Sequence, residues 1–168
     1  MWYILERNRN VQVYIPPHSD DKFKKKIKSY GVAIAETAGI TEIKERVFIS
    51  DELKGLSKGE TVYEHGLVLK SDKGLVFITG CAHPGLINIV RDVKKKFNEN
   101  IYFLMGGFHL KDKENSEILG IIEELKNLGV KHVAPLHCTG RDAIGIIKKY
   151  FGNDYISLGK YIPYEIDV

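Results

Sequence analysis

The stretch FITGCAHPGL, residues 77–86, leads from an apolar run through a glycine and a cysteine to a histidine. Two later stretches have the same plan: IYFLMGGFHL, residues 101–110, carries His109, and HVAPLHCTG, residues 132–140, carries His137. Each apolar run has the length and composition of a buried strand bounded by turn residues. Three predicted strands therefore each deliver one histidine at the carboxyl end, and this recurrence decides the fold prediction.

The segments around these strands predict an alternation of strands and helices. Residues 61–79 form two alternating strands joined at a turn over 71–74, where Asp-Lys-Gly is typical of a hairpin. Apolar residues at helical spacing predict helices over 85–97, 117–128 and 141–150. Strands separated by helices in this order predict an α/β fold.

The remaining segments are less regular. The first ten residues resemble the tail of a helix, and residues 32–39 fit either a strand or a helix. The other expected elements are a strand over 11–15, a helix over 19–30, strand character near 50, loops over 50–60 and 110–116, and a last strand over 154–159.

Composition predicts one globular domain over residues 1–168, since the chain is 43% hydrophobic and 28% charged. Its 25 basic and 22 acidic residues are interspersed, so we expect no nucleic-acid partner. Cys81 and Cys138 form no CxxC pair or disulfide framework, which indicates a reducing compartment. No apolar run is long enough to span a bilayer, so we expect a cytoplasmic protein without a membrane partner. Two methionines and nine tyrosines would suit a thermophile.

The three strand-end histidines predict a metal site. His83, His109 and His137 are 26 and 28 residues apart, about one strand-helix unit each. Because the carboxyl ends of parallel strands meet at one edge of a sheet, the three imidazoles could converge on one ion. The alternative is that each is a hydrogen-bonded boundary residue. We assign structural roles to the other three histidines, His18 in a loop, His65 inside a strand and His132 at the start of one.

The residues beside these histidines predict a substrate site. Gly106 and Gly107 would let a substrate approach the backbone near His109. Thr139 is a candidate N-cap of the next helix and a candidate substrate contact. We expect the two cysteines to line the site without binding metal, and Asp112 and Glu114 to lie in a solvated loop.

The motifs TGCAHPGL, MGGFHL and PLHCTG, in this order, resemble the metallo-β-lactamase superfamily. They are most similar to the branch that includes proteins like dihydropterin ribofuranosylaminobenzene-phosphate synthase. The resemblance implies that His83 and His137 bind a metal, typically zinc. It also implies that His109 lies near the metal and substrate, as a catalytic residue.

The same resemblance predicts the C-terminal part of an αββα sandwich, with a mixed sheet and flanking helices. Complete relatives carry an HxHxDH segment that supplies further ligands, and this string does not occur in the printed sequence. We therefore expect an incomplete metal site, because a catalytic zinc takes three protein ligands and a metal pair takes more. Either self-association or a partner chain supplying the other half of the sandwich would complete the fold.

Three functional hypotheses follow. The first is a metal-dependent, hydrolase-like enzyme acting on a small anionic or phosphate-containing substrate; the pterin branch would instead imply condensation of a dihydropterin alcohol derivative with an arylamine. The second is a catalytically inactive, truncated domain that serves as a binding or oligomeric module. The third is an anion-binding loop in a doubly wound fold, which the missing GxGxxG and P-loop lysine disfavour.

Overall fold

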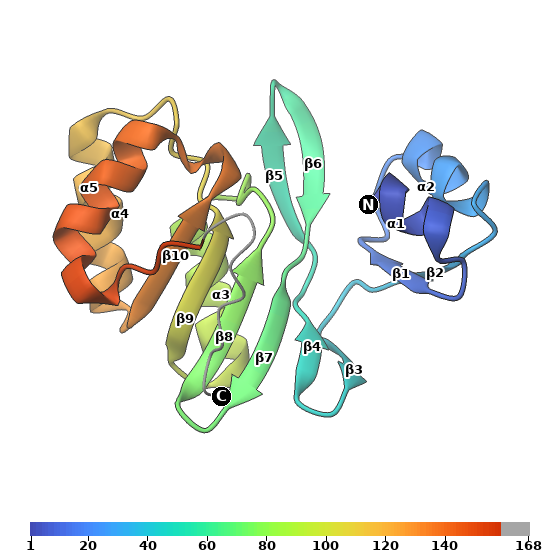
Figure 1. Ribbon diagram of the computed structural model, residues 1–168, viewed down its shortest axis with the longest axis horizontal. Helices are drawn as coiled ribbons and strands as arrows, with labels where there is room; N and C mark the ends of the chain where they lie inside the picture. Colours follow the sequence, from blue (N-terminus) through green and yellow to red (C-terminus); the bar gives the residue numbers. More distant parts are fainter. Residues whose placement is uncertain (159–168) are drawn as a thin grey trace.

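A six-stranded mixed sheet is the centre of the protein (Figure 1). The computed structural model describes residues 1–158. Its strands are β3 (Thr41–Lys44), β4 (Val47–Ile49), β7 (Leu67–Ser71), β8 (Gly74–Thr79), β9 (Ile101–Gly107) and β10 (His132–Leu136). Their order is β10–β9–β8–β7–β4–β3. β8, β9 and β10 are parallel, and the pairings through β7, β4 and β3 are antiparallel. The predicted α/β fold with a mixed sheet is confirmed.

Three helices cover one face of this sheet. They are α3 (Leu86–Phe97), α4 (Asn115–Asn127) and α5 (Arg141–Phe151). Their apolar stripes pack on Leu75, Phe77 and Leu104 of the sheet, while the alternate residues Val76 and Phe103 point to the other face. Both sets are almost fully buried. The parallel strands therefore have a core on each side, as expected for long apolar runs without polar alternation.

The first part of the chain forms a smaller unit beside the main sheet (Figure 1). It contains α1 (Trp2–Arg7), β1 (Gln12–Ile15), α2 (Asp21–Lys28) and β2 (Ala33–Glu36), with β1 and β2 paired in parallel. The Asp20 carboxylate caps α2 by accepting a 3.0 Å hydrogen bond from the Phe23 amide. Trp2 stacks on Tyr30 and meets Phe23 edge-on. The ambiguous segment 32–39 thus contains a strand.

A hairpin replaces the loop predicted over residues 50–60, so that prediction is wrong. β5 (Leu53–Ser57) pairs with β6 (Glu60–Glu64) across a two-residue turn. Lys58 and Gly59 both have positive φ, 51° and 81°, as a type I′ turn requires. His65 consequently lies in the link between β6 and β7, and not inside a strand as predicted.

The predicted strand over 154–159 is also not formed in the described residues. Tyr155 makes one isolated bridge to Val133, and the Ile156 amide donates to the Val133 carbonyl at 2.8 Å. Gly159, the last residue of that prediction, lies outside the described part of the chain. The other predicted elements of the second half form with boundaries shifted by a few residues.

Candidate metal centre

The carboxyl ends of β8, β9 and β10 meet at one edge of the sheet. Gly106 of β9 is in register with Thr79 of β8 on one side and with Pro135 of β10 on the other. The loops that follow carry the three predicted histidines. The rings of His83 and His109 lie side by side, with centroids 4.5 Å apart and planes inclined by 56°. The structure therefore brings these two imidazoles together, although they are 26 residues apart in sequence.

His137 begins the short 3-10 helix that follows β10 and is solvent-exposed. The preceding residue, Leu136, ends β10 and is in register with Gly107 at the end of β9. The neighbouring Cys138 thiol donates to the Cys81 carbonyl at 3.5 Å, which links this loop to the one before His83. The backbone thus places His137 at the same edge of the sheet, and its assignment as a metal ligand stays a prediction.

Uncommon backbone conformations gather in these three loops. Ala82, His109 and His137 have φ values of 58°, 52° and 48°, in the left-handed region that non-glycine residues seldom adopt. Such conformations persist only where the surrounding structure imposes them, and they concentrate at functional sites. Each loop after a parallel strand therefore has one strained residue at or beside a candidate histidine.

A carboxylate that the sequence analysis missed holds His83. The Glu64 carboxylate accepts a 3.0 Å hydrogen bond from the His83 amide and lies 2.6 Å from His83 Nδ1. Both side chains are largely buried, 15% and 18% exposed. Glu64 ends β6, 19 residues upstream. Recognition of the turn at Lys58-Gly59 would have placed it at a strand end, but no local signal pairs it with His83.

Glu64, Cys81 and His83 form a group whose ligand atoms all lie within 4.8 Å of one another. Carboxylate, thiolate and imidazole are all zinc ligands, so the donor chemistry fits a transition metal. Burial, the neighbouring Cys138 thiol and the Glu64 charge raise the pKa of Cys81 to about 11. Without a metal the thiol is therefore protonated near neutral pH, and the expectation that Cys81 lines the site without binding metal stays a prediction.

Gly106 and Gly107 are required by close backbone packing. A Cβ on Gly106 would lie 2.1 Å from the Thr79 carbonyl oxygen, and Gly106 has a φ of +128°. A Cβ on Gly107 would lie 2.6 Å from the Gly80 carbonyl oxygen and 2.7 Å from Cys138 Sγ. These contacts explain both glycines without a substrate, and their proposed part in substrate binding stays a prediction.

Thr139 supports the loop that carries His109. Its hydroxyl accepts a 3.1 Å hydrogen bond from the Phe108 amide and donates one of 2.7 Å to the Leu136 carbonyl. The side chain is fully buried. The N-cap of α5 is Gly140, so the predicted capping role of Thr139 is wrong: its hydroxyl faces β9 and not the helix. Its predicted contact with substrate stays untested.

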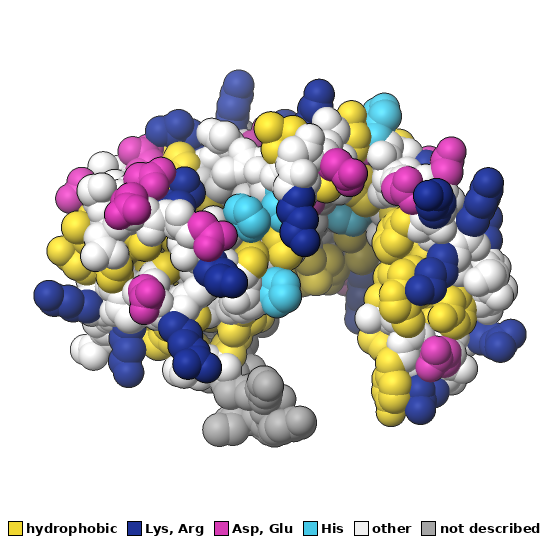
Figure 2. Space-filling model, turned by 90° about the horizontal axis from the view of Figure 1, so that it is seen from above, with side chains coloured by type: hydrophobic (Ala, Val, Ile, Leu, Met, Phe, Trp, Pro, Cys, Tyr) yellow, Lys and Arg dark blue, Asp and Glu magenta, His cyan; other side chains and the backbone are white. Residues whose placement is uncertain are grey.

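Two surface depressions border His109. One, of about 400 Å³, is also lined by His83 and Lys113; the other, of about 300 Å³, by Lys111, Lys113 and Cys138. Histidine side chains gather along the inner rim of the hollow seen in Figure 2, with basic side chains beside them. The exposed His109 imidazole and the lysines that line the two depressions are groups that can bind an anionic oxygen.

The structural roles predicted for the other three histidines stay predictions. The exposed His18 ring stacks on Tyr63, and the Glu52 carboxylate accepts from the His18 amide and contacts Nδ1 at 2.7 Å. Burial lowers the pKa of His65, and a hydrogen bond with the Tyr14 backbone and the charge of Glu52 offset part of this effect. His132 lies 3.2 Å from the Asp154 carboxylate, at the opposite end of β10 from the site. Asp112 lines the second depression, and Glu114 caps α4.

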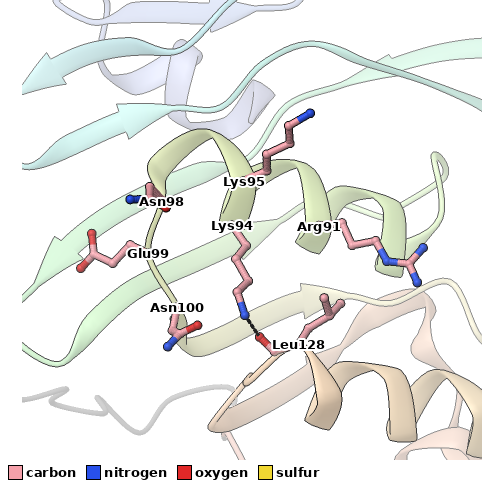
Figure 3. Close-up of a pocket in the computed structure, with 7 residues that line it drawn as sticks. All are labelled: Arg91, Lys94, Lys95, Asn98, Glu99, Asn100 and Leu128. Carbon is pink, nitrogen blue, oxygen red and sulfur yellow. Dashed lines mark hydrogen bonds between the residues drawn. The ribbon is translucent and has the colours of Figure 1, made fainter.

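A further depression of about 580 Å³ lies at the other end of β9 (Figure 3). Three basic residues, two asparagines, Glu99 and Leu128 line it, and two of the basic side chains have partners. Lys94 Nζ donates to the Leu128 carbonyl at 2.6 Å, and Arg91 pairs with Glu124 at 2.7 Å. These two bonds join α3 to the end of α4.

The chain is similar to two curated proteins of Methanocaldococcus jannaschii. It is 38% identical over 104 residues to 7,8-dihydropterin-6-methyl-4-(beta-D-ribofuranosyl)-aminobenzene-5'-phosphate synthase, covering 60% of this chain and 35% of that protein. It is 34% identical over 87 residues to an uncharacterized protein, covering 52% and 33%. The chain thus spans about a third of the length of the curated relatives it matches. No protein-family model matches it.

Among solved structures, the chain is similar to Tm1679, a metal-dependent hydrolase of the β-lactamase superfamily. The TM-score is 0.81 at 27% identity, and the match covers 96% of this chain and 73% of that one. None of the described helices has the length and apolarity to cross a membrane. The chain has a metallo-β-lactamase-like fold and resembles both this hydrolase and the dihydropterin ribofuranosylaminobenzene-phosphate synthase.

Proposed function

We propose that the chain contributes His83, His109 and His137 to the active centre of a metal-dependent enzyme of the metallo-β-lactamase fold. The observation that carries the proposal is the meeting of the His83 and His109 rings at the carboxyl edge of β8–β10, with centroids 4.5 Å apart. In this proposal His83 and His137 hold a divalent transition metal such as zinc. Further ligands would come from residues other than these three histidines.

The residues divide the chemistry between them. A bound divalent cation would polarise the bond under attack and lower the pKa of a water. His109 is exposed and borders both depressions, so it can hydrogen-bond an anionic substrate oxygen or donate a proton to it. Lys111 brings positive charge to the second depression, which Asp112 also lines, and Lys113 pairs with Glu117 at 3.1 Å. The substrate proposed is therefore small and anionic, with a phosphate group as the best fit.

Two reaction classes are compatible with this site. The similarity to a metal-dependent hydrolase favours hydrolysis, which we propose first. The similarity to a synthase that is named for a dihydropterin and an aminobenzene ribofuranosyl phosphate favours condensation of a pterin derivative with an arylamine. Both classes use the same rim, because both need a group that binds a phosphate or a developing negative charge beside the metal.

Zinc titration of the metal-free chain by calorimetry tests the proposal. We expect one site whose affinity falls at least about tenfold in His83→Ala and in His137→Ala, because each removes one ligand from a small set. His18→Ala is the matched control, since His18 also contacts a glutamate but does not line either depression beside His109. Zinc binding that is unchanged in both ligand variants, or equally weakened in the control, would contradict the assignment.

A binding or oligomeric module without catalysis is the second candidate. It is favoured by the outer surface of α1, where Met1, Tyr3 and Ile4 are 50%, 66% and 56% exposed. Exposed apolar groups gathered in this way favour association. Sedimentation equilibrium on the wild type and on Ile4→Glu tests this candidate: a dimer that the substitution dissociates, in a chain that binds no zinc, would support it, and a monomer would remove it.

A further inference from the structure

We propose that Glu64 is a positioning residue that fixes the rotamer and the tautomer of His83, and that the β5–β6 hairpin is the platform on which it does so. The proposal deepens the proposed function, since it rests on His83 as the metal ligand. Its structural part, the state of the His83 ring, can be tested without any metal.

The contact between the Glu64 carboxylate and His83 Nδ1 determines the tautomer. An ionised carboxylate only accepts hydrogen bonds. The 2.6 Å approach of Glu64 Oε1 to His83 Nδ1 therefore requires the ring proton on Nδ1. Nε2 is then left with a free lone pair, the form in which a neutral imidazole binds a metal. A carboxylate behind a histidine ligand also increases the basicity of the ring.

The second contact fixes the backbone. Glu64 Oε2 accepts the His83 amide hydrogen at 3.0 Å, so one carboxylate holds both the main chain and the ring of the same residue. Both side chains are largely buried, which limits competition from water. Ala82, immediately before, has a φ of 58°, and these bonds help to hold that strained turn.

The hairpin places Glu64 by close packing. Glu64 is in register with Leu53, and two residues further along β5 lies Gly55. A Cβ on Gly55 would lie 2.6 Å from the His83 carbonyl carbon and 2.6 Å from Pro84 N, so the strand backbone rests directly against the His83–Pro84 peptide. Gly55 and Glu64 thus contact the same turn from the two strands of one hairpin.

The chain contains a second pair of the same kind, which supplies a control. Glu52 accepts from the His18 amide at 3.0 Å and contacts His18 Nδ1 at 2.7 Å. His18 is 66% exposed on its side chain and stacks on Tyr63. The chain therefore contains two Glu–His pairs with the same contacts. The buried pair, Glu64 and His83, is the one that lies beside His109.

The first experiment is nitrogen NMR of the metal-free chain with labelled histidine, in alkaline buffer where imidazoles are neutral. We expect His83 in the Nδ1–H form in the wild type. In Glu64→Gln the amide can donate to Nδ1, so the Nε2–H form should become populated. Glu52→Gln should change the His18 signals and leave those of His83 unchanged. Glu64→Asp, which keeps the charge, should restore the Nδ1–H form in part.

The second experiment is zinc titration of the same variants. We expect Glu64→Gln to weaken zinc binding by about 10–100-fold, the usual effect of removing a carboxylate behind a histidine ligand. Glu52→Gln should leave it unchanged, and Glu64→Asp should recover part of the loss. If Glu64→Gln shifted the His83 tautomer but left the zinc affinity unchanged, His83 would not be the ligand and the proposed function would fail. An Nε2–H ring in the wild type, or a ring unaffected by Glu64→Gln, would overturn the positioning role itself.

Discussion

Replacement of Gly55 by alanine should disturb the candidate site from a distance. The added methyl would meet the His83 carbonyl carbon and Pro84 N at 2.6 Å and the His83 oxygen at 2.9 Å. All three are backbone atoms, so no flexible side chain can yield. Overpacking of this kind costs about 1–3 kcal/mol. With a urea slope of about 2 kcal/mol/M, the unfolding midpoint should fall by about 0.5–1.5 M.

Urea unfolding of Gly55→Ala beside Gly80→Ala measures this effect. Gly80 is the matched control, because it lies in the loop before His83 and a Cβ there would have no atom within 4 Å. We expect Gly80→Ala to change the free energy of unfolding by less than about 0.5 kcal/mol. Equal midpoints for the two variants would refute the close packing of β5 against the His83–Pro84 peptide, and with it the role assigned to the hairpin.

Burial lowers the pKa of His65 from its ordinary value of 6.5, so the unfolded chain binds more protons below that pH. In chelator-containing buffer, the free energy of unfolding should therefore fall as the pH drops below 6.5, by at most about 1.4 kcal/mol per pH unit. Urea titrations of His65→Gln should show a smaller dependence on pH. Gly120→Ala and Gly145→Ala, at open helical positions, should each raise stability by about 0.5–1 kcal/mol in the same assay; a loss would contradict the open space. Thr139→Val, which leaves the Phe108 amide without its partner, should lower the free energy of unfolding by about 1–3 kcal/mol, and an unchanged value would show that this bond contributes nothing.

The second half of the fold could be predicted because its elements have strong local patterns. The helical stripe of α3 and the turn at Ser71–Gly74 are both readable within a dozen residues, and both form as predicted. The convergence of His83 and His109 follows from the rule that parallel strands end at one edge. Strand order and the 4.5 Å ring separation show that the two rings lie together, and the roles assigned to them stay predictions.

The parts that escaped prediction depend on contacts between distant segments. β5 is short and has Gly55 at its centre, so its sequence resembles a loop; only the fit against His83–Pro84 explains the glycine. Glu64 acquires its role from a loop 19 residues downstream, and nothing beside it in the sequence indicates that loop. Thr139 resembled a helix cap because Ser and Thr favour that position, but the Phe108 amide competes successfully for its hydroxyl.

X-ray absorption at the zinc edge of the zinc-loaded chain tests the central claim most directly, because it counts imidazoles and sulfur atoms around the ion. The account predicts imidazole scattering that decreases by one ring in His83→Ala and by one in His137→Ala, with His18→Ala unchanged. Sulfur scattering from Cys81, or an imidazole count unaffected by both ligand variants, would contradict a metal centre built from the ends of β8 and β10.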